Sequence, residues 1–279
     1  MIQKNFMRFP RGKSKAVTLS FDDGVRADIR MAAKLKELHL CATFNLYSGF
    51  WNGDRTDQSG EKLLSPEECK LYLTQPGFEL AVHTRNHPHL TRITAEEVEK
   101  EILEDKQAIE ELAEAPVRGM AYPYGLFDEQ SKQVAKACGI VYSRTCKSHY
   151  DFGIPTDWLE WGPTCHYKEK DVPVIMEEFL TMSPKEDPAL FYLWTHSYEC
   201  TLNDHWDVFF GYLERLAHKE DIWYATNIGV YDYVEAYKRL QFTVDEAVVT
   251  NPSAISVWIE TEGRITEIRP GETVRIREK

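Results

Sequence analysis

The segment that decides the fold reads Ala16-Val17-Thr18-Leu19-Ser20-Phe21-Asp22-Asp23-Gly24. Residues 16–21 form a short apolar, partly β-branched run bounded by a turn signal, a pattern that predicts a buried strand. Two neighbouring carboxylates repel each other, so a cation or a proton must compensate them wherever they are even partly buried. Asp22 and Asp23 are therefore the first candidates for a functional site, although Asp-Asp-Gly alone is more often an ordinary turn.

Further apolar runs alternate with helix-period stretches along most of the chain. The runs predict strands over residues 16–21, 41–46, 78–82, 117–121, 140–143, 190–194 and 221–225. Helices are expected over residues 26–38, 128–137, 168–180, 206–217 and 228–240, and two more begin at the caps Ser65-Pro66 and Thr94. Alternating strands and helices are typical of parallel α/β folds. We expect a distorted (β/α) barrel of about seven parallel strands over residues 1–240.

The end of the chain has a different pattern. Residues 241–249, 254–261 and 272–276 are rich in β-branched side chains and are separated by Asn-Pro, Glu-Gly and Pro-Gly turn signals. This pattern predicts a C-terminal antiparallel β appendage over residues 241–279, packed on the barrel. Covering an edge or end of the barrel is its expected role, with a separate binding role as the alternative.

Composition limits the partners. The formal net charge is −12, from 45 acidic and 33 basic residues, which would repel phosphate backbones and anionic lipid surfaces. No run approaches the ~20 apolar residues of a membrane span, and the first residues lack the apolar core of a secretion signal. We therefore expect no nucleic acid or membrane partner, a cytoplasmic location and reduced cysteines. The oligomeric state is not predicted.

A second cluster of polar residues follows the predicted strand 78–82. It reads His83-Thr84-Arg85-Asn86-His87-Pro88, and the proline favours a loop rather than a helix. In parallel α/β folds the carboxyl ends of the strands meet at one face, so the histidines and the aspartate pair can come together. One carboxylate and two imidazoles leave coordination positions open, as catalytic metal sites do. Zinc suits this set, and cobalt, nickel or iron also fit.

On these residues the sequence resembles the polysaccharide deacetylases of the NodB-homology type, carbohydrate esterase family 4. Four segments of that family stand in order here, at residues 20–24, 83–88, 121–125 (Ala-Tyr-Pro-Tyr-Gly) and 193–196 (Leu-Trp-Thr-His). The nearest counterpart of a further segment is Asp157-Trp158. The resemblance spans about residues 17–240 and leaves the β appendage outside.

The resemblance implies a division of roles. Asp22 would be the general base, His196 the general acid, and the backbone N–H of Tyr124 the oxyanion donor. A divalent ion lowers the pKa of a bound water from 15.7 toward ~7, and a nearby carboxylate can take its proton during attack on an acetyl carbonyl. The implied metal ligands are Asp23, His83 and His87.

One departure from the family concerns the arginine of the third segment, which steadies the catalytic aspartate and is replaced here by Ala121. Arg144 ends the next predicted strand and can reach the same face. We hypothesise that Arg144 orients Asp22, with an ordinary surface arginine as the alternative.

A second departure concerns the partner of His196. Asp157 is a candidate, but a loop cap is the alternative reading. Glu199 follows His196 by three residues and is expected to tune it or to contact the substrate. Aromatic side chains can stack on sugar rings, although those in strand-like stretches usually pack in the core. The expected substrate contacts are Tyr124, Trp158, Trp161 and Glu199.

The predicted function is metal-dependent hydrolysis of a non-peptide carbon–nitrogen bond. An acetyl group would be removed from a carbohydrate, with N-acetyl preferred and O-acetyl possible, by attack of a metal-bound water. Two alternatives stay open because loops set the substrate. One is a C–N hydrolase for a small non-sugar amide, and the other is a non-catalytic carbohydrate-binding homologue.

Overall fold

The computed structural model describes residues 5–51 and 56–277, and its centre is a curled parallel sheet. The strand order is β6-β5-β4-β3-β2-β8-β7, with β9 beside the start of β2, and every pairing is parallel. This arrangement confirms the predicted α/β fold, and all seven predicted strands are present. The strands are β2 (Lys15–Asp23), β3 (Ala42–Leu46), β4 (Phe78–Val82), β5 (Gly119–Ala121), β6 (Tyr142–Arg144), β7 (Cys165–His166), β8 (Ala189–Thr195) and β9 (Ile222–Tyr224).

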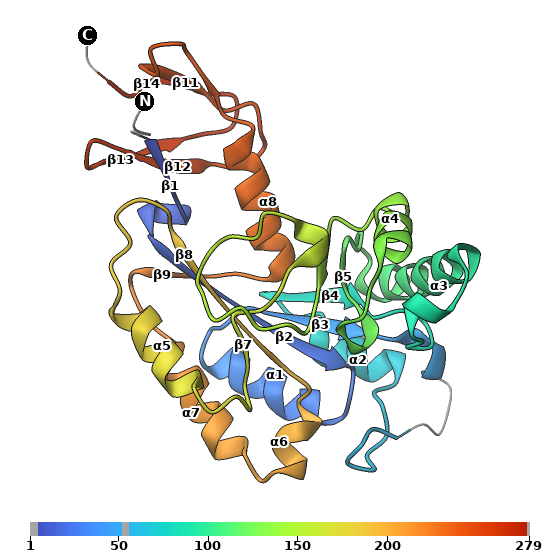
Figure 1. Ribbon diagram of the computed structural model, residues 1–279. Helices are drawn as coiled ribbons and strands as arrows, with labels where there is room; N and C mark the ends of the chain where they lie inside the picture. Colours follow the sequence, from blue (N-terminus) through green and yellow to red (C-terminus); the bar gives the residue numbers. More distant parts are fainter. Residues whose placement is uncertain (1–4, 52–55, 278–279) are drawn as a thin grey trace.

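Helices surround the sheet (Figure 1). Capping boxes start three of the described helices, at Ser65, Thr94 and Asp128, and the sequence predicts the caps at Ser65 and Thr94. A further short helix, residues 198–202, was not predicted because five residues after a strand show no helical period. The helices are α1 (Ala27–Glu37), α2 (Pro66–Leu73), α3 (Ala95–Ala113), α4 (Glu129–Ala137), α5 (Val172–Thr181), α6 (Tyr198–Leu202), α7 (Trp206–Leu216) and α8 (Asn227–Lys238). The 3-10 turns of the described residues are η1 (Pro10–Gly12), η2 (Ser48–Phe50), η3 (Leu90–Arg92), η4 (Pro123–Gly125) and η5 (Trp158–Glu160).

An irregular segment, residues 161–164, spans the gap between the two outer strands of the curled sheet, β6 and β7. Trp161 bridges to Arg144 at the end of β6, with its N–H donating to the Ser143 carbonyl at 3.0 Å. The segment then reaches β7, which pairs with β8. The curl therefore closes through this segment rather than through a regular strand pair.

The two faces of the sheet pack against different partners. Strand residues alternate between faces, so Val17, Leu19 and Phe21 join the large cluster beneath the outer helices. Leu190 and Tyr192 belong instead to an aromatic-rich cluster with α8 on the inner face.

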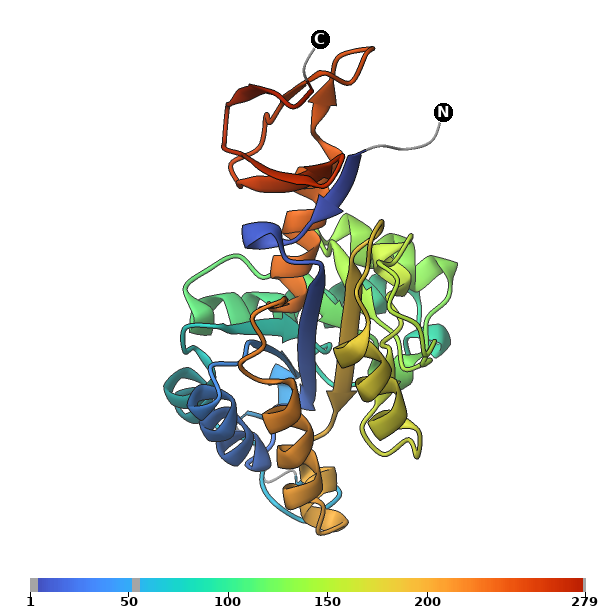
Figure 2. The same ribbon diagram turned by 90° about the vertical axis from the view of Figure 1, so that its left-hand side faces the viewer.

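The appendage consists of two three-stranded antiparallel sheets at one end of the barrel (Figures 1 and 2). β1 (Asn5–Arg8) pairs with β12 (Val257–Thr261), and β12 pairs with β13 (Arg264–Ile268). The second sheet joins β10 (Gln241–Phe242), β11 (Val248–Thr250) and β14 (Thr273–Arg275). We propose a domain division at residue 240, with the N-terminal strand contributing to the C-terminal unit.

Two general features of the chain follow from the described residues. None of the helices found there is both long enough and apolar enough to cross a membrane. All six cysteines lie in the described part of the chain and are free thiols.

Candidate active site

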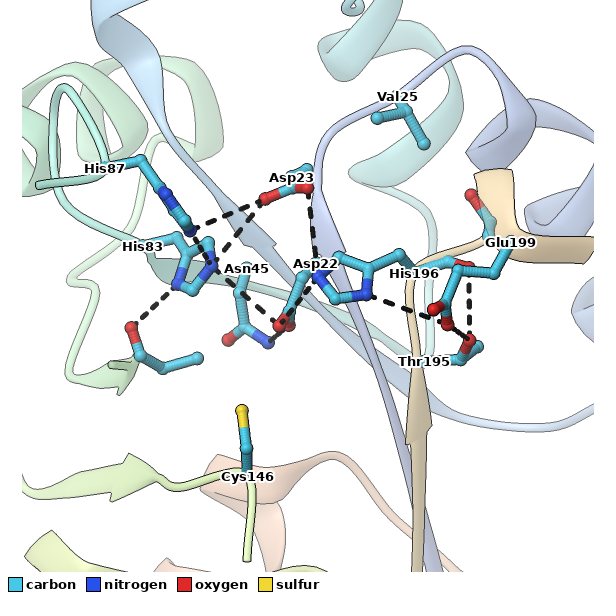
Figure 3. Close-up of polar contacts among 12 residues, drawn as sticks. Asp22, Asp23, Val25, Asn45, His83, His87, Cys146, Thr195, His196 and Glu199 are labelled. Atoms are coloured by element: carbon cyan, nitrogen blue, oxygen red, sulfur yellow. Dashed lines mark hydrogen bonds and ion pairs between the residues drawn. The ribbon is translucent and has the colours of Figure 1, made fainter. Parts of the chain in front are cut away.

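The two polar clusters meet at the carboxyl end of the sheet (Figure 3). Asp22 and Asp23 end β2, His83 follows β4, and His196 follows β8. His83 Nε2 lies 3.8 Å from Asp22 Oδ2 and 3.7 Å from Asp23 Oδ1. His196 Nε2 approaches from the other side, 4.0 Å from Asp22 Oδ2 and 3.9 Å from Asp23 Oδ2.

Asp23, His83 and His87 offer one ligand atom each within 4.8 Å of one another. The Nε2 atoms of the two histidines are 3.1 Å apart, and His87 Nε2 lies 4.0 Å from Asp23 Oδ1. Ligands held at ~2.1 Å around a tetrahedral ion are about 3.4 Å apart. The three side chains therefore fit a single divalent ion with little movement.

Left-handed backbone shapes this cluster. Asp23, Thr84 and His87 have φ values of 83°, 64° and 54°. Neighbouring strand residues normally point to opposite faces, and the turn at Asp23 instead brings its carboxylate to the same side as Asp22. Non-glycine residues in this region are uncommon and cluster at functional sites, which fits the role expected of these loops.

Hydrogen bonds fix the orientation of His83. Its Nδ1 lies 2.8 Å from the carbonyl oxygen of Ala121, which can only accept, so Nδ1 carries the proton and Nε2 presents its lone pair. Its backbone N–H donates to Leu46 O at 2.8 Å and to Asp105 Oδ2 at 3.1 Å. Burial lowers the pKa of His83 despite the carboxylates nearby, which favours the neutral, ligating form.

Asp22 is buried and held by two side chains. Asn45 Nδ2 donates to Oδ1 at 2.8 Å, and Arg144 Nη2 donates to Oδ2. Burial works to raise the pKa of Asp22, but the Arg144 guanidinium, His83, His196 and Asn45 hold it well below the usual range. Asp22 is therefore ionised at neutral pH.

Arg144 occupies the place the sequence hypothesis requires. It is fully buried, and its guanidinium lies 4.1 Å from the centre of the Trp194 ring. In the β5–β6 register its Cα is paired with that of Ala121. The guanidinium thus comes from the strand next to the one that carries Ala121.

Glu199 is the centre of a hydrogen-bond network beside His196. Its Oε2 accepts from Thr195 Oγ1 at 2.9 Å and lies 2.8 Å from His166 Nε2, while Lys168 pairs with Oε1 at 2.6 Å. His196 Nδ1 is 3.8 Å from the same Oε2. Burial lowers the pKa of His196, but Glu199 and the two aspartates outweigh it and raise the pKa to about 9.

His166, His196 and Glu199 also lie close enough to hold an ion. The backbone N–H of Lys168, however, donates to His166 Nδ1 at 3.3 Å. His166 Nε2 then carries the ring proton and donates it to Glu199, so its lone pair is not available to a metal. The second cluster is better described as a hydrogen-bond network that holds Glu199 beside His196.

Tyr124 lies at the rim of the site. Its φ of 59° turns the η4 segment, and its side chain is 51% exposed. The ring stacks on His89 at 4.1 Å and meets His87 edge-on at 4.5 Å. This position is compatible with both expected roles of Tyr124, in oxyanion binding and in substrate contact.

Three residues of the 155–161 segment do not reach the site. Trp161 is 1% exposed, and Trp158 packs edge-on against it at 5.0 Å within the inner aromatic cluster. The expectation that the two tryptophans contact substrate is wrong, because core packing buries both rings. Asp157 caps η5 by accepting from Leu159 N at 2.9 Å and pairs with Lys132, so it is a loop cap and not the partner of His196.

Asn45 was missed by sequence reasoning. Strand register places it beside Asp22 on β3. A polar residue within an apolar strand run was the available signal, because a buried amide requires a hydrogen-bond partner.

A family model of known proteins matches the part of the chain that contains most of the candidate site. Residues 10–143 match the family model "Polysaccharide deacetylase", which includes both aspartates, His83, His87 and Tyr124. The match ends just before Arg144 and well before His196.

Among solved structures, a Mycobacterium smegmatis protein assigned to the polysaccharide deacetylases aligns at 15% identity and a TM-score of 0.61, over 84% of this chain and 94% of that one. A family 4 carbohydrate esterase pseudoenzyme from Bacillus anthracis aligns at 16% identity and a TM-score of 0.50, over 80% and 66%. A Streptococcus pyogenes deacetylase aligns at 22% identity and a TM-score of 0.41 over 46% of this chain, and the alignment spans 55% of that protein's length. The first two share the fold, and residues 10–143 of this chain match the polysaccharide deacetylase family.

Proposed function

We propose that the protein is a metal-dependent deacetylase that hydrolyses an acetyl group on a carbohydrate, with N-acetyl preferred over O-acetyl. The observation that carries this proposal is the position of ionised Asp22 between the Asp23–His83–His87 cluster and His196. A base, an acid and a set of metal ligands converge there on one small volume.

Asp23, His83 and His87 are the residues that hold the ion, and zinc suits them best. Such an ion supplies a nucleophilic water at neutral pH and an electrophile for the acetyl carbonyl oxygen. The Ala121 carbonyl keeps His83 in the tautomer that ligation requires.

Asp22 accepts the proton of the attacking water. Asn45 and Arg144 fix both of its oxygens, so the carboxylate meets the water in one orientation. Arg144 here takes the supporting role that the family gives to an arginine at the position of Ala121.

His196 donates a proton to the leaving nitrogen. The pKa of about 9 keeps its imidazole protonated at neutral pH. Glu199 faces Nδ1 and directs Nε2 toward the two aspartates. The backbone N–H of Tyr124 stabilises the oxyanion that forms on the carbonyl oxygen.

A small non-sugar amide is the second candidate substrate. The cavity beside the cluster measures about 200 Å³, which is below the ~300–1,000 Å³ typical of pockets for drug-sized ligands. A compact amide would therefore fit it as well as one sugar unit.

The test is an acetate-release assay with protein purified without chelator, after its metal content has been measured. Turnover of N-acetylglucosamine oligomers supports the proposal. Turnover of a linear or cyclic amide, with no acetate from any sugar, would replace it by the second candidate. Protein that binds no divalent metal and turns over neither class would be a non-catalytic relative.

A further inference from the structure

The cavity beside the cluster contains an acid that the proposed mechanism does not use. Asp57 lies on the segment that joins β3 to α2, where Thr56 pairs with Lys62 in an antiparallel bridge. The cavity measures about 200 Å³ and is lined by Asp23, Tyr47, Thr56, Asp57, Gln58, His87, Tyr124 and Tyr198.

The two oxygens of Asp57 are in different environments. Oδ1 accepts from Ser59 N at 2.7 Å, Ser59 Oγ at 2.6 Å and Glu61 N at 3.1 Å. Oδ2 is buried and has no hydrogen-bond partner among the described residues. Burying a carboxylate oxygen without a donor is costly, so this atom calls for an explanation.

Neither loop structure nor the metal cluster supplies that explanation. Oδ1 alone makes the contacts that hold the turn, and a serine or asparagine side chain could make them without a buried charge. Asp57 also lies outside the group of ligand atoms formed by Asp23, His83 and His87. Oδ2 therefore keeps an unused acceptor on a residue that lines the cavity.

We propose that Asp57 Oδ2 accepts a hydrogen bond from a ring hydroxyl of the substrate, and that this contact selects an acetylated sugar over an amide without hydroxyls. The inference rests on the proposed function, because the acetyl group must react at Asp22. An ionised carboxylate only accepts, and sugar hydroxyls are the donors that a carbohydrate brings. The small cavity places this contact on the sugar unit that carries the acetyl group.

The expected effect follows from the strength of a hydrogen bond to a charged group. Losing the charged acceptor should cost about tenfold to a hundredfold in sugar affinity. A substrate without hydroxyls should be unaffected, because it never makes the contact.

The test compares Asp57→Asn with the wild type on N-acetylglucosamine oligomers and on 4-nitrophenyl acetate, an ester without sugar hydroxyls. We expect KM for the sugar to rise at least tenfold, with kcat, ester turnover and metal content unchanged. Ser59→Ala is the matched control, since it removes one donor to Oδ1 and leaves Oδ2 in place. Equal changes on both substrates, or none on either, would overturn the inference.

A second measurement separates this inference from the proposed function. Calorimetry of N-acetylglucosamine binding is carried out in the Asp22→Asn background, with and without Asp57→Asn, so that no turnover is needed. Weaker binding on replacement of Asp57 supports the subsite even if the wild type releases no acetate. Unchanged binding together with normal acetate release rejects the subsite and leaves the deacetylase proposal standing.

Discussion

The two ends of the central sheet hold carboxyl groups with different neighbours, the buried Asp22 and the half-buried Glu79. At the carboxyl end, Asp22 contacts the Arg144 guanidinium, and its pKa lies well below the usual range. At the amino end, Glu79 on β4 accepts from Thr43 Oγ1 at 2.8 Å, Tyr142 OH at 2.7 Å and Ile228 N at 2.9 Å. Burial raises the pKa of Glu79 to about 7 despite these three bonds.

The contrast shows that a contacting cation, more than the number of hydrogen bonds, decides whether a buried acid is charged. The carboxyl end keeps ionised groups close together, which catalysis requires. The amino end joins α8 to the sheet through largely neutral groups, with Asn227 bonded to Thr18 and Tyr192. We therefore expect substitutions at the first end to impair chemistry and substitutions at the second to change stability.

The largest effect is expected from Asp22→Asn. The amide cannot take the proton of the attacking water, so acetate release should fall about 1,000-fold, within the ~10²–10⁴ range of general base catalysis. Metal content should stay at the wild-type level because Asp22 is not a proposed ligand. A variant with full turnover and full metal content would disprove the base assignment.

The next largest effect should distinguish the two histidine clusters. His83→Ala removes a proposed ligand, and metal affinity should fall at least ~100-fold. His166→Ala should leave both affinity and stoichiometry unchanged, because its ring donates to Glu199. Competition with a chromogenic chelator measures both variants. A second equivalent of metal in the wild type that disappears in His166→Ala would contradict our description of that cluster.

Arg144→Ala should lower acetate release by about 30- to 100-fold, because Asp22 loses its orienting cation. Breaking a buried pair also costs about 3–5 kcal/mol of folding stability, so activity must be measured below the melting transition. The double variant Arg144→Ala with Ala121→Arg is the sharper probe, since the register places the two positions side by side. Restored activity would support the hypothesis that Arg144 orients Asp22 in place of an arginine at position 121. Full activity in Arg144→Ala alone would reject that hypothesis.

Glu199→Gln should have a smaller effect, about tenfold on kcat with KM and metal content unchanged. The amide keeps the shape of the side chain but removes the charge that faces His196 Nδ1. Glu199→Asp, which retains the charge, should recover part of the loss. An increase in KM alone would instead mark Glu199 as a substrate contact.

The smallest effect is a change in how stability depends on pH. The pKa of Glu79 is raised from 4.5 in the unfolded chain to about 7 in the folded one, so the folded state holds the proton more tightly. Its stabilising contribution is complete below about pH 4.5 and is lost as the pH rises through 7. Between pH 5 and 8, the free energy of unfolding measured with denaturant should fall by about 2–3 kcal/mol less in Glu79→Gln than in the wild type. Parallel curves for the two proteins would show that Glu79 does not titrate in this range.

Much of the fold could be predicted because each central strand is an apolar run with its own boundaries. β1, β7 and β13 escaped detection. Strands of four and two residues, such as β1 and β7, depend on their partners rather than on local pattern. The convergence of Asp23, His83 and His87 could be predicted, since strand order alone sends these residues to one face.

Other parts of the site depend on packing that one sequence does not reveal. Trp158 and Trp161 carry no local sign of whether a ring faces solvent or the core. Asn45 meets Asp22 through strand register, so its partner is not a sequence neighbour, and only the fold places Asp57 beside the cavity. The contact between Arg144 and Asp22 could be predicted because Ala121 and Arg144 lie at adjacent strand ends.

The pairing of β1 with β12 has a consequence for how the chain folds as it is made. Thr261 Oγ1 donates to Asn5 Oδ1 across 256 residues of sequence. During synthesis β1 leaves the ribosome long before β12 has been made, so the barrel can form before β1 is paired. Contacts of such long sequence separation are slow to form. Closure of the appendage should therefore be a late, separate step, and shortening the C-terminus would leave the N-terminal strand without a sheet.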